Sequence, residues 1–309
     1  MFMLIRKMFS FSLKIIKHFA LNTSAVFCFC ISVNAQEKIN LFPVNAIPNS
    51  KSTNIKESFG QGMFRNTTAP TLEVYIPEKA NGTAVIICAG GGYAVIVYNG
   101  EGVNTAKELA KKGITAFVLK YRLPDDSVML DKSIGPLQDA QEAIKYIREN
   151  AVKWNIDTNK VGIMGFSAGG HLASTVATHF NKSFIENNTN TNLKPDFQIL
   201  IYPVISMQDN LTHKDSRKKL LGSNPTKESI DFFSSELQIT DNAPPAYITH
   251  AADDVTVDVD NSIQYFEALR HKKIPVEMHI YPSGGHGFIF RQQGWIDPLL
   301  LWMKKNKWL

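Results

Sequence analysis

One succession of short segments at residues 161–179 limits the fold more than any other feature: an apolar run, a glycine-rich turn and a helical stretch. The turn reads Gly165-Phe-Ser-Ala-Gly169, a G-x-S-x-G pattern centred on Ser167. When such a turn joins a strand to a helix, it holds a serine hydroxyl above the sheet, near the positive end of the helix. The backbone is crowded there, so small residues must flank the serine. We therefore expect Ser167 to be a catalytic nucleophile, the alternative being a turn that only packs.

The remainder of the chain alternates β-rich runs with amphipathic stretches, which is typical of a mostly parallel sheet with helices on both faces. The expected strands are Thr71–Ile76, Ala84–Cys88, Thr115–Lys120, Val161–Gly165, Phe197–Ile201, Ala246–His250 and Val276–Ile280. The expected helices are 105–112, 136–152, 168–179, 263–271 and 298–305. With no break in composition, we expect one α/β domain over residues 71–309. Residues 206–245 interrupt the alternation, and we expect this excursion to border the substrate cleft.

The first 35 residues have the pattern of a secretory signal peptide: a basic start, an apolar run and Val33-Asn-Ala35 before Gln36. Cleavage there predicts a secreted or periplasmic protein, whereas an uncleaved anchor is the alternative. Four of the 33 basic residues lie in this segment, which has no acid, so 29 basic residues remain against 28 acidic ones. This balance gives no indication of nucleic acid or an anionic membrane as partner. Residues 36–70 are expected to form a polar N-terminal arm.

Two segments after the serine offer a base and an acid at the carboxyl ends of expected strands, where open α/β sheets place their sites. His286 lies in the glycine loop 284–287, and Asp254 follows the strand that ends at His250. A serine hydroxyl needs such a base, and the base needs a carboxylate that orients it. Asp254 is favoured as the acid, while the adjacent Asp253 is expected to cap a turn or bond loop amides. The order Ser167, Asp254, His286 is that of α/β-hydrolases.

The segment Ala89-Gly-Gly-Gly-Tyr93 directly follows an expected strand and can turn backbone N–H groups toward a developing oxyanion. The expected donors are the amides of Ala168 and of Gly91 or Gly92, with a merely flexible loop as the alternative. The segment stands where esterases carry an H-G-G-G motif, with alanine in place of histidine.

Taken together, several motifs resemble secreted bacterial α/β-hydrolase esterases of the acetylxylan esterase and feruloyl esterase type. The resemblance covers roughly residues 58–302 and rests on Ala89–Tyr93, Val118–Pro124, Gly165–Ala173, Asp253-Asp254 and Gly285–Gly287. It implies a single-domain serine carbohydrate esterase that removes acetyl groups from decorated plant polysaccharide such as xylan through an acyl-enzyme. The resemblance also implies no metal site and no cofactor. The implied partner is an acetylated or feruloylated oligo- or polysaccharide, with no nucleic acid and no membrane after signal cleavage. Such esterases often have proline where Ala89 stands, which affects loop stiffness more than the donors.

Other functions stay open at this point. A feruloyl esterase or a general carboxylesterase would use the same residues. A prolyl-oligopeptidase-like peptidase shares the triad, but residues 36–70 are too short for its propeller. From another class comes a catalytically silent hydrolase fold that binds glycans. Glycoside cleavage would need two carboxyl groups across a sugar, and the sequence gives no independent case for such a pair.

Overall fold

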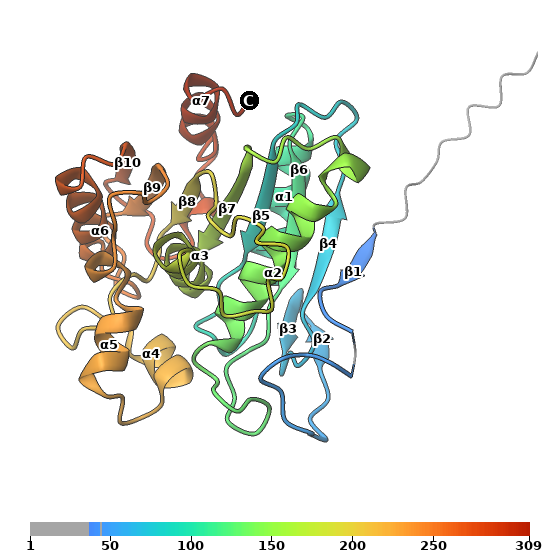
Figure 1. The fold of residues 1–309 in the computed structure, drawn as a ribbon. Coiled ribbons are helices and arrows are strands. Elements are labelled where there is room, and N and C mark those ends of the chain that lie inside the picture. Colours follow the sequence, from blue (N-terminus) through green and yellow to red (C-terminus); the bar gives the residue numbers. More distant parts are fainter. Residues whose placement is uncertain (1–36, 44) are drawn as a thin grey trace, which may run out of the picture. The chain divides into compact units, whose positions relative to one another are not determined.

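The computed structural model describes residues 37–43 and 45–309, so the signal peptide expected over residues 1–35 lies outside them. Eight strands form the central sheet in the order β1-β4-β6-β5-β7-β8-β9-β10 (Figure 1). Their bounds are β1 Lys38–Asn40, β4 Thr71–Tyr75, β5 Ala84–Cys88, β6 Thr115–Lys120, β7 Val161–Phe166, β8 Gln198–Ile201, β9 Ala246–Ala251 and β10 Val276–Tyr281. Strand β4 runs antiparallel to β1 and to β6, and all pairs from β6 to β10 are parallel.

Helices lie on both faces of this sheet. Helices α2 and α3 pack against each other in front of it in Figure 1, and α1 lies behind it against β6 and β4. The helices are α1 Asn104–Ala110, α2 Gly135–Glu149, α3 Ser167–His179, α4 Lys214–Leu221, α5 Lys227–Phe233, α6 Asp260–His271 and α7 Asp297–Lys305. None of the helices in the described ranges is long and apolar enough to cross a membrane.

The central strands read as continuous apolar runs because helices cover both of their faces. Every residue of β5, β6, β7 and β9 is buried. Parallel sheets of this kind lose the alternation of apolar and polar residues that a half-exposed strand shows. The seven strands and five helices predicted from the sequence are confirmed, with their ends shifted by no more than three residues.

Several short elements were not predicted. Strand β1 is three residues long and extends the sheet beyond β4, while β2 (Ser58–Gly60) and β3 (Met63–Arg65) form a separate antiparallel pair. The excursion 206–245 contains α4, α5 and a short 3-10 turn, Ser235–Leu237. Figure 1 shows α4 and α5 in gold below α6. The excursion leaves the sheet at the carboxyl end of β8, which is the end that carries the site described next.

Candidate active site

Ser167 lies at the turn between β7 and α3, in a backbone conformation that a side chain rarely adopts. Its φ angle is +51°, in the left-handed region. A Cβ atom on Gly165 would lie 2.1 Å from the carbonyl oxygen of Gly169, and one on Gly169 would lie 2.1 Å from that of Cys88. Neither position can therefore hold a side chain, which is why the turn needs glycine on both sides of the serine.

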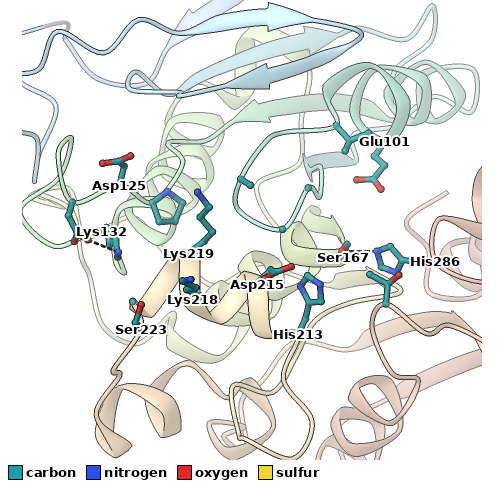
Figure 2. Close-up of a pocket in the computed structure, with 18 residues that line it drawn as sticks. Glu101, Asp125, Lys132, Ser167, His213, Asp215, Lys218, Lys219, Ser223 and His286 are labelled. Carbon is teal, nitrogen blue, oxygen red and sulfur yellow. Dashed lines mark hydrogen bonds and ion pairs between the residues drawn. The ribbon is translucent and has the colours of Figure 1, made fainter.

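A chain of hydrogen bonds links Ser167 to a histidine and a carboxylate from two other loops. The Oγ atom of Ser167 is 2.9 Å from Nε2 of His286, and Nδ1 of His286 is 2.7 Å from Oδ2 of Asp254. Because a carboxylate can only accept, Nδ1 carries the proton and Nε2 accepts from the serine hydroxyl. Figure 2 shows Ser167 and His286 facing each other at one end of a cleft. This arrangement can take up the hydroxyl proton as Oγ attacks an electrophile.

The carboxylate of Asp254 is buried and has four hydrogen-bond donors. Its Oδ1 accepts from the amides of Thr256 at 2.9 Å and Val257 at 3.0 Å. Its Oδ2 accepts from His286 and, at 3.2 Å, from Nε2 of His250. Burial opposes ionisation, but the hydrogen bonds from the two histidines and the Val257 amide outweigh it and hold the pKa of Asp254 well below its usual range. Asp254 therefore stays a carboxylate beside the imidazole.

His250 is a partner of this carboxylate that the sequence did not reveal. Its Nε2 also lies 2.9 Å from the carbonyl oxygen of Val257, and since both neighbours only accept, Nε2 carries a proton. Its Nδ1 then accepts from the hydroxyl of Ser262 at 2.7 Å. The sequence places His250 at the end of a strand, four residues before Asp254. That offset favours Asp254 as the acid, but it does not show that His250 itself bonds to the carboxylate.

The neighbouring Asp253 supports the loop that carries the histidine. Its Oδ1 accepts from the amide of Gly285 at 2.7 Å. Arg291 holds the same loop from the other side through the carbonyl oxygens of Gly284 at 2.5 Å and His286 at 2.9 Å. The two adjacent carboxylates thus contact different parts of one loop, Asp254 the ring and Asp253 the backbone.

The glycine loop after β5 presents backbone amides to the same cavity. Gly91 and Gly92 have φ angles of +125° and +63°, and a Cβ on Gly91 would lie 2.3 Å from the carbonyl oxygen of Val95. Within the described ranges, neither amide has a protein acceptor. The amide of Ala168 lies in the first turn of α3, where no intrahelical acceptor is available. The amides of Gly91, Gly92 and Ala168 are the groups predicted from the sequence to donate hydrogen bonds to an oxyanion.

Glu101 is a second residue that the sequence did not reveal. Its buried carboxylate accepts from the amide of Gly90 at 2.5 Å and from the hydroxyl of Tyr202 at 3.0 Å. Burial raises the pKa of this carboxyl, although both hydrogen bonds favour the ionised form. The ring of Tyr202 packs on that of His286, with centroids 4.8 Å apart. Glu101 therefore links Gly90, at the start of the glycine loop, to Tyr202, the residue that packs on His286.

Glu101→Ala should lower kcat by about 10²-fold, because one misplaced oxyanion donor costs that much. Glu101→Gln should stay within about tenfold of the wild type, since its carbonyl oxygen can accept from Gly90 and its NH₂ group can donate to Tyr202. Both variants are measured with a small aryl acetate, alongside their melting temperatures. Equal activity of the alanine variant and the wild type would show that Glu101 does not position the loop.

His171 connects the glycine loop, α3 and the excursion. Its Nε2 lies 2.7 Å from the carbonyl oxygen of Phe233, and its Nδ1 lies 2.8 Å from the hydroxyl of Tyr93. Because the carbonyl only accepts, the neutral ring donates to Phe233 and accepts from Tyr93. Burial lowers the pKa of His171 from 6.5 to about 4.

This histidine should make the protein less stable in acid. The unfolded chain binds a proton at His171 near pH 6.5, but the folded chain resists it until about pH 4. The free energy of unfolding should therefore fall across this window, by about 3 kcal/mol from this group, and level off below it. We expect the free energy of unfolding of His171→Gln to fall by about 3 kcal/mol less than that of the wild type between pH 7 and pH 4. Urea unfolding at pH 7, 6, 5 and 4 measures this difference. Parallel curves for the two proteins would contradict the assignment.

A cavity of about 890 Å³ runs from Ser167 along the excursion. Figure 2 shows Ser167 and His286 at one end, Asp125 and Lys132 at the other, and residues of α4 along one side. Its lining is mostly polar or charged and includes His213, Asp215, Lys218, Lys219 and Ser223 from the excursion and Asp125, Asp126 and Lys132 from the loop after β6. In the described part of the chain, no group of three or more His, Cys, Asp or Glu is placed to hold a metal ion.

The BD-FAE family model matches residues 72–269, which is more than half of the chain and includes Ser167 and Asp254. The chain belongs to the BD-FAE family. Among solved structures, this family member is similar to the acetyl ester-xyloside bifunctional hydrolase of Caldicellulosiruptor lactoaceticus, with 33% identity and a TM-score of 0.74 over 89% of this chain and 97% of the other. This likeness confirms the predicted α/β-hydrolase fold.

Two curated relatives are similar to this BD-FAE family member at the level of sequence. One is endo-1,4-beta-xylanase B of Butyrivibrio fibrisolvens, 40% identical over 71% of this chain and 34% of its own length. The other is the acetylxylan esterase of Xylanibacter ruminicola, 39% identical over 70% of this chain and 43% of its own length. The chain therefore spans less than half the length of either relative.

Proposed function

We propose that this protein is a serine carboxylic ester hydrolase that removes acetyl groups from xylan-type polysaccharide. The observation that carries the proposal is the hydrogen-bonded chain Ser167–His286–Asp254 beside the free amides of the glycine loop. The names of the relatives support a substrate of acetylated xylose units. The cleft beside the serine suits such a substrate, because carboxylate, ammonium, imidazole and hydroxyl groups among its lining residues can bond to the hydroxyl groups of a sugar.

In the proposed reaction, Ser167 Oγ attacks the ester carbonyl while His286 Nε2 takes the hydroxyl proton. Asp254 orients the ring and stabilises the imidazolium that forms. The amides of Ala168 and of Gly91 or Gly92 stabilise the oxyanion. His286 then protonates the departing sugar oxygen as its bond to the carbonyl carbon breaks, which leaves an acetyl group esterified to Ser167 Oγ. It next deprotonates a water that attacks this acetyl-enzyme and returns the proton to Ser167 Oγ, which releases acetate and restores the free serine.

Export is a separate proposal. The signal-peptide pattern of residues 1–35 supports cleavage before Gln36 and a secreted or periplasmic protein, which would bring the enzyme to polysaccharide outside the cell. Sequencing the N-terminus of the exported protein tests the cleavage site.

The test of the proposed function is acetate release from acetylated xylan, measured beside ferulate release from feruloylated arabinoxylan. Acetate from the first substrate, absent with Ser167→Ala, supports the proposal. Ferulate without acetate would keep the mechanism and move the substrate to aromatic esters. A folded protein that releases neither, and that a fluorophosphonate does not label, would be a silent fold instead.

Xyloside cleavage is the second candidate, because the solved relative from Caldicellulosiruptor lactoaceticus is named as a bifunctional hydrolase of acetyl esters and xylosides. It requires two carboxyl groups across a sugar, one of them kept protonated by a raised pKa. The hydroxyl of Ser127 lowers the pKa of Asp125 in the cleft. Burial raises the pKa of Glu101, which also lines the cleft, but its two oxygens already accept hydrogen bonds from Gly90 and Tyr202. The site therefore favours ester hydrolysis, and an aryl xyloside in the same assay tests the alternative.

A further inference from the structure

His213 is the residue just before α4, and its ring is fixed by the helix that it caps. Its Nδ1 lies 2.8 Å from Oγ of Ser216 and 3.4 Å from the backbone nitrogen of Ser216. A backbone N–H can only donate, so Nδ1 is the acceptor at the start of the helix. Burial lowers the pKa of His213 and favours the neutral ring. The neutral ring then carries its proton on Nε2.

This N–H group is directed into the cleft beside the serine. His213 lines the same cavity as Ser167 and His286. Its Cε1 atom is 3.9 Å from the point where a Cβ on Gly92 would stand, so the ring lies next to the glycine loop at the serine end of the cavity. Figure 2 shows the ring pointing from the start of α4 into this space. Among the described residues, no protein group accepts from its Nε2.

The chemistry of the ester decides which half of the substrate this donor meets. An acetyl group has one carbonyl oxygen, which the backbone amides bind, and a methyl group that offers no acceptor. The alcohol half is a sugar with several hydroxyl groups and a ring oxygen. The cavity also continues past His213 to Lys218 and Lys219 on α4 and to Ser223 just after it, which provide further donors.

We propose that His213 Nε2–H donates to an oxygen of the sugar that carries the ester, and that α4 is the wall of a sugar-binding subsite. This inference rests on the proposed function and adds to it a residue that determines specificity for the alcohol half. It explains why the capping position holds a histidine, since serine or asparagine would cap α4 equally well but would not reach into the cleft.

The test compares His213→Ser, which keeps a capping oxygen but shortens the side chain, with the wild type. The ratio of kcat/KM for acetylated xylo-oligosaccharides to kcat/KM for 4-nitrophenyl acetate should fall about tenfold, the usual effect of one lost hydrogen bond. Lys214→Gln, an exposed change at the first residue of α4, is the matched control and should leave the ratio unchanged. An unchanged ratio in His213→Ser, or an equal loss on both esters, would overturn the inference.

A second measurement separates this inference from the proposed function. Unacetylated xylo-oligosaccharide should inhibit hydrolysis of 4-nitrophenyl acetate competitively, with an inhibition constant about tenfold higher in His213→Ser. Inhibition that depends on His213, without deacetylation of the glycan by the wild type, would keep the sugar subsite and reject the proposed function. Deacetylation of the glycan, with the same ratio and the same inhibition in His213→Ser as in the wild type, would keep the proposed function and reject the sugar subsite. The absence of both deacetylation and inhibition would reject both.

Discussion

Ser167→Ala should lower kcat by about 10⁶-fold while the fold is retained. The proposed reaction has no covalent intermediate without the Oγ atom, and His286 then has no hydroxyl to deprotonate. Turnover is measured with 4-nitrophenyl acetate and acetylated xylan, and the fold by the melting temperature. Alanine can adopt the backbone conformation of Ser167 at a similar cost, so we expect the melting temperature to shift by only a few degrees.

Ser174 on the same helix gives the matched control. It is also buried, but its hydroxyl bonds to Ser235 at 2.9 Å and to the carbonyl oxygen of His171 at 3.0 Å, away from the cleft lining. Ser174→Ala should keep kcat within about twofold and lose about 1 kcal/mol of stability. Near-normal turnover of Ser167→Ala would end the serine mechanism. A comparable loss in Ser174→Ala would mean that the helix, rather than the hydroxyl, is being tested.

Asp254→Asn should lower kcat by about 10⁴-fold. The carboxylate accepts on both oxygens, two backbone amides on Oδ1 and two imidazole N–H groups on Oδ2. An asparagine that keeps its oxygen on the amides must turn its NH₂ group toward the two rings. His286 can then bond it only through an unprotonated Nδ1, which places the proton on Nε2 and removes the acceptor for the serine hydroxyl.

The adjacent Asp253→Asn is the control for this change. Asp253 accepts from the Gly285 amide, and an asparagine oxygen can accept the same bond. Its kcat should therefore stay within about tenfold of the wild type in the same aryl acetate assay. The opposite ranking of the two variants would assign the acid to Asp253.

The sequence predicted the sheet and the proposed triad because their signals are local. Most residues of the central strands are apolar, and Ser167, Asp254 and His286 all follow the carboxyl ends of strands, beside glycines or a second acid. Helices α4 and α5 were missed because they are short and polar, with few apolar residues to show helical spacing.

Residues whose position depends on contacts far along the chain could not be predicted. Glu101 bonds Tyr202, which is 101 positions away, and neither residue carries a recognisable pattern. His250 orients Asp254 only because the loop after β9 folds back over the end of its own strand. His213 enters the cleft because α4 begins there, and the sequence did not predict that helix.

The bonds of His171 also bear on how substrate range can change in this fold. Phe233, at the end of α5, accepts from the same ring that holds Tyr93 at the end of the glycine loop. The excursion that forms one wall of the cleft is therefore not an independent module. Exchanging residues 206–245 for the corresponding segment of a relative would alter the reaction rate as well as the choice of substrate, unless the donor segment brings a carbonyl oxygen to the same place. An exchanged segment that ends before Phe233 keeps the bond between His171 and the Phe233 carbonyl oxygen. Such a segment can change the cleft lining while Tyr93 and the glycine loop stay in place.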